Sequence, residues 1–125
     1  MRGRQVKVKG ERALRRELRR LERAYPDAMQ HALTEEAMDV LAASQPLTPV
    51  DLGDLVGSGV VGRLPGSDAG AVVAYGKSYA LPVHERTEVA HAGKTQAKYL
   101  EQPFEELSSG MQARIVQRIK RKVVV

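Results

Sequence analysis

The chain has 125 residues, of which 42% are hydrophobic and 28% charged, a composition typical of a single folded domain. It contains no Cys, no Trp and a single Phe. Disulfides, thiol nucleophiles and cysteine-ligated zinc are therefore excluded, and aromatic platforms for nucleic-acid bases are scarce. Apolar runs are only a few residues long, so no transmembrane helix is predicted.

The net charge of +5 is distributed unevenly along the chain. Residues 1–23 carry ten Lys or Arg against three Glu, and residues 114–125 carry five Lys or Arg and no acidic residue. Residues 24–113 carry twelve Asp or Glu against five Lys or Arg. The sequence thus describes an acidic body with two basic ends, and only those ends are suited to phosphate contacts.

The N-terminal third is predicted to hold a basic arm and a helix. Residues 1–10 form the arm, either disordered or an edge strand through Val6 and Val8. Residues 11–23 are predicted to be helical, because leucine recurs there at spacings of four and three. Pro26 disfavours helix at the residue before it, which indicates a kink or the first residue of a second helix.

The second helix is predicted to end near Ser44, because apolar residues from Met29 to Leu41 follow helical spacing and Pro46 and Pro49 come after them. Three short apolar segments bounded by Gly, Pro and Ser then predict strands. They cover residues 56–61, 71–75 and 79–83.

The remaining segments are two loops and a last helix. Residues 63–70 read as a hairpin loop, and residues 85–97 as a long exposed loop. Pro103 is predicted to be the first residue of the last helix, whose apolar stripe runs from Phe104 to Ile119 at spacings of three and four.

This order of elements predicts an α+β fold. Two or three helices, including a long C-terminal one, are expected to pack on one small antiparallel sheet. A single domain would cover residues 11–122, followed by a short tail at residues 123–125. So small a sheet would leave its edges exposed, which favours self-association.

Catalytic chemistry is not indicated by any motif. His84 with Glu85, together with His91, could bind a metal ion, but no second motif supplies further ligands, and His31 is expected to be an ordinary helix residue. No serine lies in a G-x-S-x-G turn, and no phosphate-binding glycine motif is present. We therefore expect no catalytic residue, no metal and no cofactor. A hydrolase or metal-dependent enzyme around His84 and His91 is a weaker alternative.

The basic ends allow two interpretations. Their cations could pair with acidic surfaces of the same or a neighbouring subunit, which we favour because the body is equally acidic, or they could contact phosphates. The residues concerned are Arg12, Arg15, Arg16, Arg19, Arg20, Arg23, Arg118, Lys120, Arg121 and Lys122.

Three segments, taken in chain order, resemble motifs of a known protein family. They are SQPLTPVDLGDLVGS at residues 44–58, VAYGKSYALPVHE at residues 73–85, and a third that begins with Gly93-Lys94 and ends KYLEQP at residues 98–103. Over residues 20–115 the chain resembles the head–tail joining or tail-completion (neck, or minor capsid) proteins of long-tailed bacteriophages. Leu52 and Val56 stand where that family usually has Thr and often Arg. The matching residues, implied to be family motif or inter-subunit interface, are Pro49, Asp51, Gly53, Leu55, Ser58, Tyr75, Gly76, Tyr79, Ala80, His84, Glu85, Gly93, Leu100 and Pro103.

The resemblance implies a structural, non-enzymatic virion protein. It implies a homo-oligomeric, hexameric ring in the neck of the virion, between the tail and the head connector. It implies assembly in the cytoplasm of a bacterial host, with no membrane as a partner. The implied partners are head connector or adaptor proteins, tail-tube or tail-terminator proteins, and packaged DNA in the channel. Tyr75, Tyr79 and His84 are equally compatible with packing inside the hairpin and with contact between subunits. The alternative function is a small nucleic-acid-binding protein that uses the basic N- and C-terminal helices.

Overall fold

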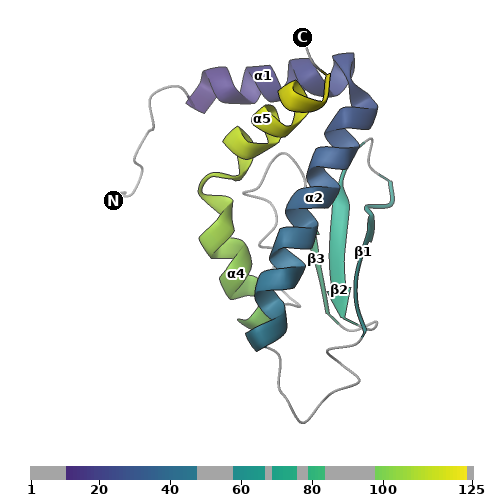
Figure 1. The fold of residues 1–125 in the computed structure, drawn as a ribbon, viewed down its shortest axis with the longest axis vertical. Helices are drawn as coiled ribbons and strands as arrows, with labels where there is room; N and C mark the ends of the chain where they lie inside the picture. The colour runs from purple at the N-terminus through teal and green to yellow at the C-terminus, as the bar shows by residue number, and fades with distance from the viewer. Residues whose placement is uncertain (1–10, 48–57, 67–68, 76–78, 84–97, 124–125) are drawn as a thin grey trace.

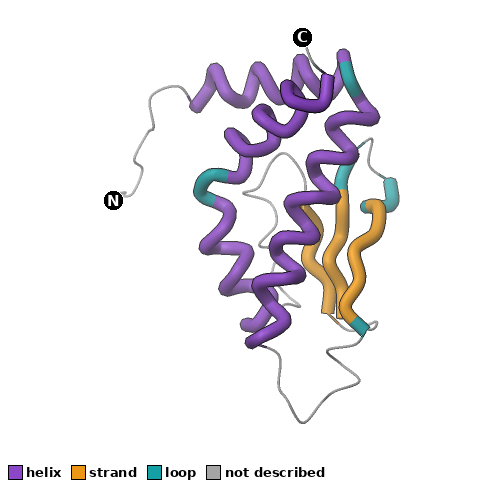
Figure 2. Tube along the Cα trace, viewed as in Figure 1, coloured by secondary structure: helices purple, strands orange, loops and turns teal. Residues whose placement is uncertain are grey.

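The computed structural model describes residues 11–47, 58–66, 69–75, 79–83 and 98–123. These residues form an α+β fold, as predicted, in which helices lie on one side of a small antiparallel sheet (Figures 1 and 2). The elements in chain order are α1 (Glu11–Ala24), α2 (Pro26–Ser44), a 3-10 turn η1 (Gln45–Leu47), β1 (Gly59–Arg63), β2 (Ala71–Tyr75), β3 (Tyr79–Val83), α4 (Lys98–Ser108) and α5 (Met111–Val123).

The first two helices end and begin where the sequence predicts. Tyr25 separates them with a φ of −136° and a ψ of 69°, outside the helical range, and Pro26 is the first residue of α2 because its missing N–H costs nothing there. The backbone N–H of Tyr25 still donates to the carbonyl of Leu21 at 2.8 Å, so the chain turns sharply without losing that hydrogen bond. As a result α1 lies across the end of α2 (Figure 1).

The described sheet has three strands in the order β1-β2-β3, all antiparallel. The predicted hairpin loop is confirmed: β1 ends at Arg63, the N–H of Leu64 donates to the carbonyl of Gly70 at 3.1 Å, and Gly66 has a φ of +76°. That left-handed conformation is cheap only for glycine, which explains the residue at this turn. The second and third strands have the predicted bounds, whereas β1 starts at Gly59 and ends at Arg63, not at the predicted residues 56 and 61.

The C-terminal region corrects one expectation. The single helix predicted to start at Pro103 is wrong in two respects. The helix α4 begins earlier, at Lys98, and contains Pro103. A turn at Ser109 and Gly110 then separates α4 from a second helix, α5. The N–H of Arg114 donates to the carbonyl of Gly110 at 3.0 Å at the start of α5. The apolar stripe continues across this turn, which is why its periodicity does not reveal the break.

The core is built around α2, which packs on one face of the sheet and also against α1, α4 and α5. Its apolar residues are fully buried together with the inward residues of β2 and one face of α5. These are Met29, Leu33, Ala37 and Val40 of α2, Ala71, Val73 and Tyr75 of β2, and Met111, Ile115 and Ile119 of α5. The arm at residues 1–10 and the predicted loop at residues 85–97 lie outside the described residues.

Candidate functional site

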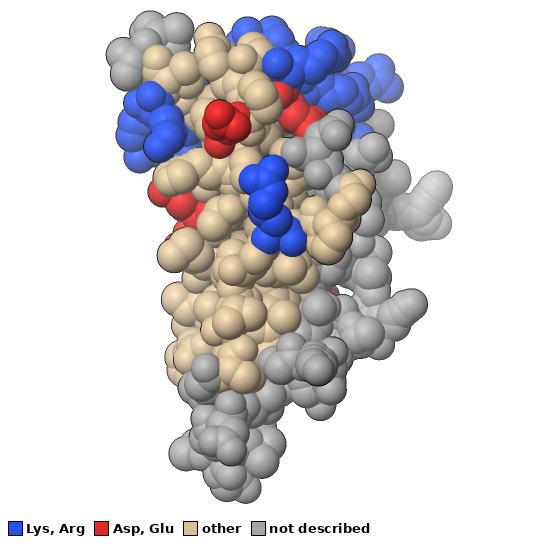
Figure 3. Space-filling view, turned by 90° about the vertical axis from the view of Figure 1, so that its right-hand side faces the viewer, with Lys and Arg blue, Asp and Glu red and all other residues tan. Residues whose placement is uncertain are grey.

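The two basic ends of the sequence meet at one end of the molecule. α1 and α5 pack against each other there, although about ninety residues separate them in sequence (Figure 1). Figure 3 shows Lys and Arg gathered at this end. We call this surface the basic end; its exposed cations are Arg12, Arg16, Arg19, Arg20, Arg23, Lys120, Arg121 and Lys122.

Four of these cations form a straight row on α1. Arg12, Arg16, Arg19 and Arg23 follow one another at spacings of four, three and four, which places them within about 60° of the helix circumference. The buried Leu18 and Leu21 are on the opposite side of the helix. All four arginines are exposed, and within the described part of the chain none of them forms an ion pair. We call these four residues the arginine row.

Glu17, an acidic residue of α1, is occupied by neighbouring cations. Arg20 Nη2 donates to its Oε2 at 2.8 Å, and Lys120 Nζ of α5 lies 3.8 Å from the same oxygen. The hydrogen bond from Arg20 is the main cause that lowers the pKa of Glu17, so this carboxylate stays charged and paired at neutral pH. It ties α1 to α5 and does not neutralise the arginine row.

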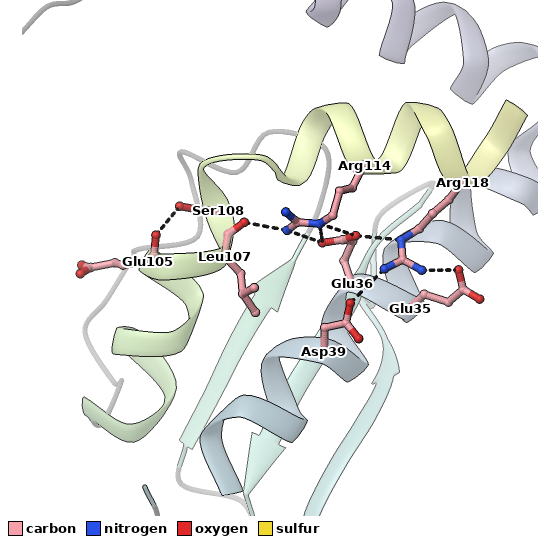
Figure 4. Close-up of polar contacts among 8 residues, drawn as sticks. All are labelled: Glu35, Glu36, Asp39, Glu105, Leu107, Ser108, Arg114 and Arg118. Carbon is pink, nitrogen blue, oxygen red and sulfur yellow. Dashed lines mark hydrogen bonds and ion pairs between the residues drawn. The ribbon is translucent and has the colours of Figure 1, made fainter. Parts of the chain in front are cut away.

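The acidic body is also paired internally, through Glu36 of α2. This side chain is fully buried, with 0% exposure, and it accepts hydrogen bonds from two arginines of α5 (Figure 4). Arg114 donates to both carboxylate oxygens at 2.9 to 3.2 Å, and Arg118 Nε donates to Oε2 at 2.8 Å. Such complete pairing is what a buried carboxylate requires.

The same arginines satisfy further acceptors. Arg114 Nη2 donates to the carbonyl of Leu107 at 2.7 Å, which caps the end of α4 (Figure 4). Arg118 also bonds Glu35 at 2.8 Å and Asp39 at 2.9 Å. Partial burial alone would lower the pKa of Arg118, but its hydrogen bonds to Glu36 and Glu35 outweigh this and raise the pKa. Arg118, a candidate contact for a partner, is therefore engaged within its own chain.

The described motif residues mostly support the scaffold. Tyr75 is fully buried, and its hydroxyl lies 2.6 Å from Ser44 Oγ and accepts a hydrogen bond from Gln45 Nε2 at 3.1 Å. This tyrosine therefore packs inside the hairpin and fastens β2 to the end of α2. Leu100 and Pro103 are likewise buried, on the inner side of α4.

For other predicted site residues, the structure gives their position in the fold. Ser58 lies in the turn before β1, and Tyr79 and Ala80 lie on β3 in register with Tyr75 and Ala74. Arg15 is partly buried on α1. The predicted residues that lie outside the described part of the chain are Pro49, Asp51, Gly53, Leu55, Gly76, His84, Glu85 and Gly93.

The outward side of the sheet is apolar at the positions the register defines. Val60 pairs with Ala74, and Gly62 pairs with Val72. Ala80 and Pro82 are the register partners of Ala74 and Val72 on β3. Val60 is 56% exposed, although antiparallel sheets usually carry polar residues on a solvent-facing side. We call Val60, Gly62, Val72 and Ala74 the outer sheet face.

The residues that the structure describes contain no group of three or more His, Asp or Glu able to hold a metal ion, and none of their helices is long and apolar enough to cross a membrane. Comparison with protein-family models, with curated proteins and with solved structures finds no match to this chain.

The sequence indicates part of this arrangement. The arginines of the row are among its candidate contacts, and their spacing of four, three and four places them on one side of a helix. Glu36 lies at helical spacing from the buried Leu33 and Val40, which indicates burial, but its partners Arg114 and Arg118 are not predictable locally because they lie 78 and 82 residues away.

Proposed function

We propose that this protein is a structural virion assembly protein of a bacteriophage neck, which forms a ring that joins or completes the tail at the head connector. The ordered motifs of residues 44–103 suggest this role. The structural observation that supports it is the outer sheet face, an apolar surface on the side of the sheet away from the helices. Contiguous apolar patches on small proteins mark contacts with other proteins.

The contacts between copies use the outer sheet face and β1, which is an outer strand of the sheet that the structure describes. Val60 lies on this strand and is 56% exposed. Burying it against a neighbouring copy removes apolar surface from water. The acidic residues Glu35, Glu36 and Asp39 do not serve this contact, since each is bonded to α5 of its own chain.

The test compares two substitutions that place a lysine on an exposed apolar position. Val60→Lys alters the outer sheet face, and Met38→Lys is the matched control because Met38 is 54% exposed on α2. Size-exclusion chromatography with mass measurement, alone and with connector or tail-tube proteins, should show a ring for the natural chain and for Met38→Lys. Val60→Lys should remain monomeric while keeping its circular dichroism spectrum.

Two results would count against the proposal. A natural chain that stays monomeric and binds neither connector nor tail-tube protein rejects the neck role. A Val60→Lys variant that still assembles rejects the outer sheet face as the contact. Imaging of particles produced without this protein provides an independent check, since separate full heads and tails are expected.

A further inference from the structure

We propose that the arginine row of α1 binds the phosphate backbone of duplex DNA. This inference does not depend on the neck role, because it follows from the charge and geometry of a single subunit. Arg12, Arg16, Arg19 and Arg23 stand in one line on the side of α1 that faces away from the core. Such a line of guanidinium groups suits an extended polyanion.

The dimensions of the row match a duplex. From Arg12 to Arg23 the helix rises about 16 Å, at about 1.5 Å per residue. Duplex DNA carries about one phosphate charge per 1.7 Å of its axis, so about ten charges lie along that length. Four arginines can therefore each meet a phosphate without competing for the same one.

Four carboxylates of the helices are paired elsewhere and do not bond to the row. Glu17 is held by Arg20 and Lys120, and the acids Glu35, Glu36 and Asp39 are bonded to α5. Within the described part of the chain, no ion pair reaches the row, and its positive charge favours a phosphate ligand.

Binding of this kind is independent of base sequence. No aromatic residue belongs to the arginine row, and the single Phe of the chain, Phe104, is buried in the core. Stacking on bases is thus not available from these residues, and the contact is to the backbone alone. Arg121 and Lys122, exposed at the end of α5, add positive charge at the same end of the molecule.

The test is fluorescence anisotropy of the full chain with a random-sequence 30-base-pair duplex over a range of salt concentrations. Four backbone contacts predict a slope of log K against log salt of about −3.6, which is a loss of about 10²-fold between 50 and 200 mM salt. The variant R12Q/R16Q/R19Q/R23Q should lose this binding and its salt dependence. Glutamine keeps helix propensity close to that of arginine, so α1 should persist, as circular dichroism would verify.

The matched control is Arg63→Gln, which removes an exposed arginine from β1 and should leave DNA affinity unchanged. Absence of binding by the natural chain at 50 mM salt, or equal loss in both variants, overturns the proposal. Loss of assembly in the quadruple variant without any DNA binding by the natural chain also overturns it and assigns the row to a protein contact. Val60→Lys should still bind DNA as a monomer, which separates this proposal from the neck role.

Discussion

Replacing both arginines that bond to Glu36 should lower the free energy of unfolding strongly. In the variant Arg114→Met/Arg118→Met the carboxylate stays fully buried but loses every hydrogen bond that the structure gives it. A buried charge without a partner costs about 3 to 5 kcal/mol. Unfolding entropy of about 2.1 cal/mol/K per residue gives about 0.26 kcal/mol/K for 125 residues, so Tm should fall by about 11 to 19 °C.

A third substitution reveals whether the penalty comes from the unpaired charge. Glu36→Met added to the double variant removes the buried carboxylate and should recover most of the lost stability, because apolar replacement of a whole buried ion cluster is often neutral. Glu35→Gln is the control: Glu35 pairs with Arg118 but is 38% exposed, so its loss should cost at most about 1 kcal/mol.

Urea unfolding followed by circular dichroism measures all four free energies, with melting as a second readout. If the double variant loses less than about 1 kcal/mol, or if the triple variant is no more stable than the double, Glu36 is not held as a buried charge. The attachment of α5 to α2 would then be stabilised mainly by apolar packing.

Three further predictions concern packing, a buried hydroxyl and pH. Gly59→Ala should destabilise by about 1 to 3 kcal/mol, because its Cβ would lie 2.9 Å from side chains of α2 and β2, whereas Gly62→Ala meets nothing within 4 Å and should be nearly neutral in urea unfolding. Tyr75→Phe should cost about 1 to 2 kcal/mol by removing a buried, hydrogen-bonded hydroxyl, with urea unfolding as the measurement. The lowered pKa of Glu17, due mainly to the hydrogen bond from Arg20, means that its stabilising effect exists at neutral pH and is lost as pH falls through that lowered pKa. A Glu17→Gln variant should therefore show a slightly shallower loss of stability in acid than the natural chain.

Local signals were sufficient to predict most of the regular structure. The local signals are the leucine spacing in α1, Pro26 at the start of α2, and the short apolar segments bounded by Gly, Pro and Ser that predict β2 and β3. Each depends on neighbours within a few residues. The same locality explains the error at Pro103. A proline is favoured at a helix start, but here the buried stripe continues on both sides of it and α4 begins five residues earlier.

The candidate site could not be predicted to the same extent, because it depends on contacts between distant segments. Helical spacing places Glu36 on the buried side of α2 with Leu33 and Val40. Nothing in residues 30–40 shows which cations make that burial tolerable, since Arg114 and Arg118 come from the other end of the chain. The three charge blocks follow from the sequence, which leaves open whether their charges pair within the subunit or with a partner. The structure shows that folding itself consumes part of the acidic block.

The ion pairs between α2 and α5 determine which charged side chains remain available to a partner. The bonds from Glu36 and its neighbours hold α5 against α2, and α5 in this position also packs against α1. The same packing of α5 therefore pairs the acidic residues of α2 and brings the two basic helices together. The arginine row takes no part in that docking, because it lies on the side of α1 opposite Leu18 and Leu21. Folding therefore pairs the charges that position α5, whereas the arginine row forms no ion pair among the residues that the structure describes. This contrast is why we propose that the ligand of the row comes from outside the subunit.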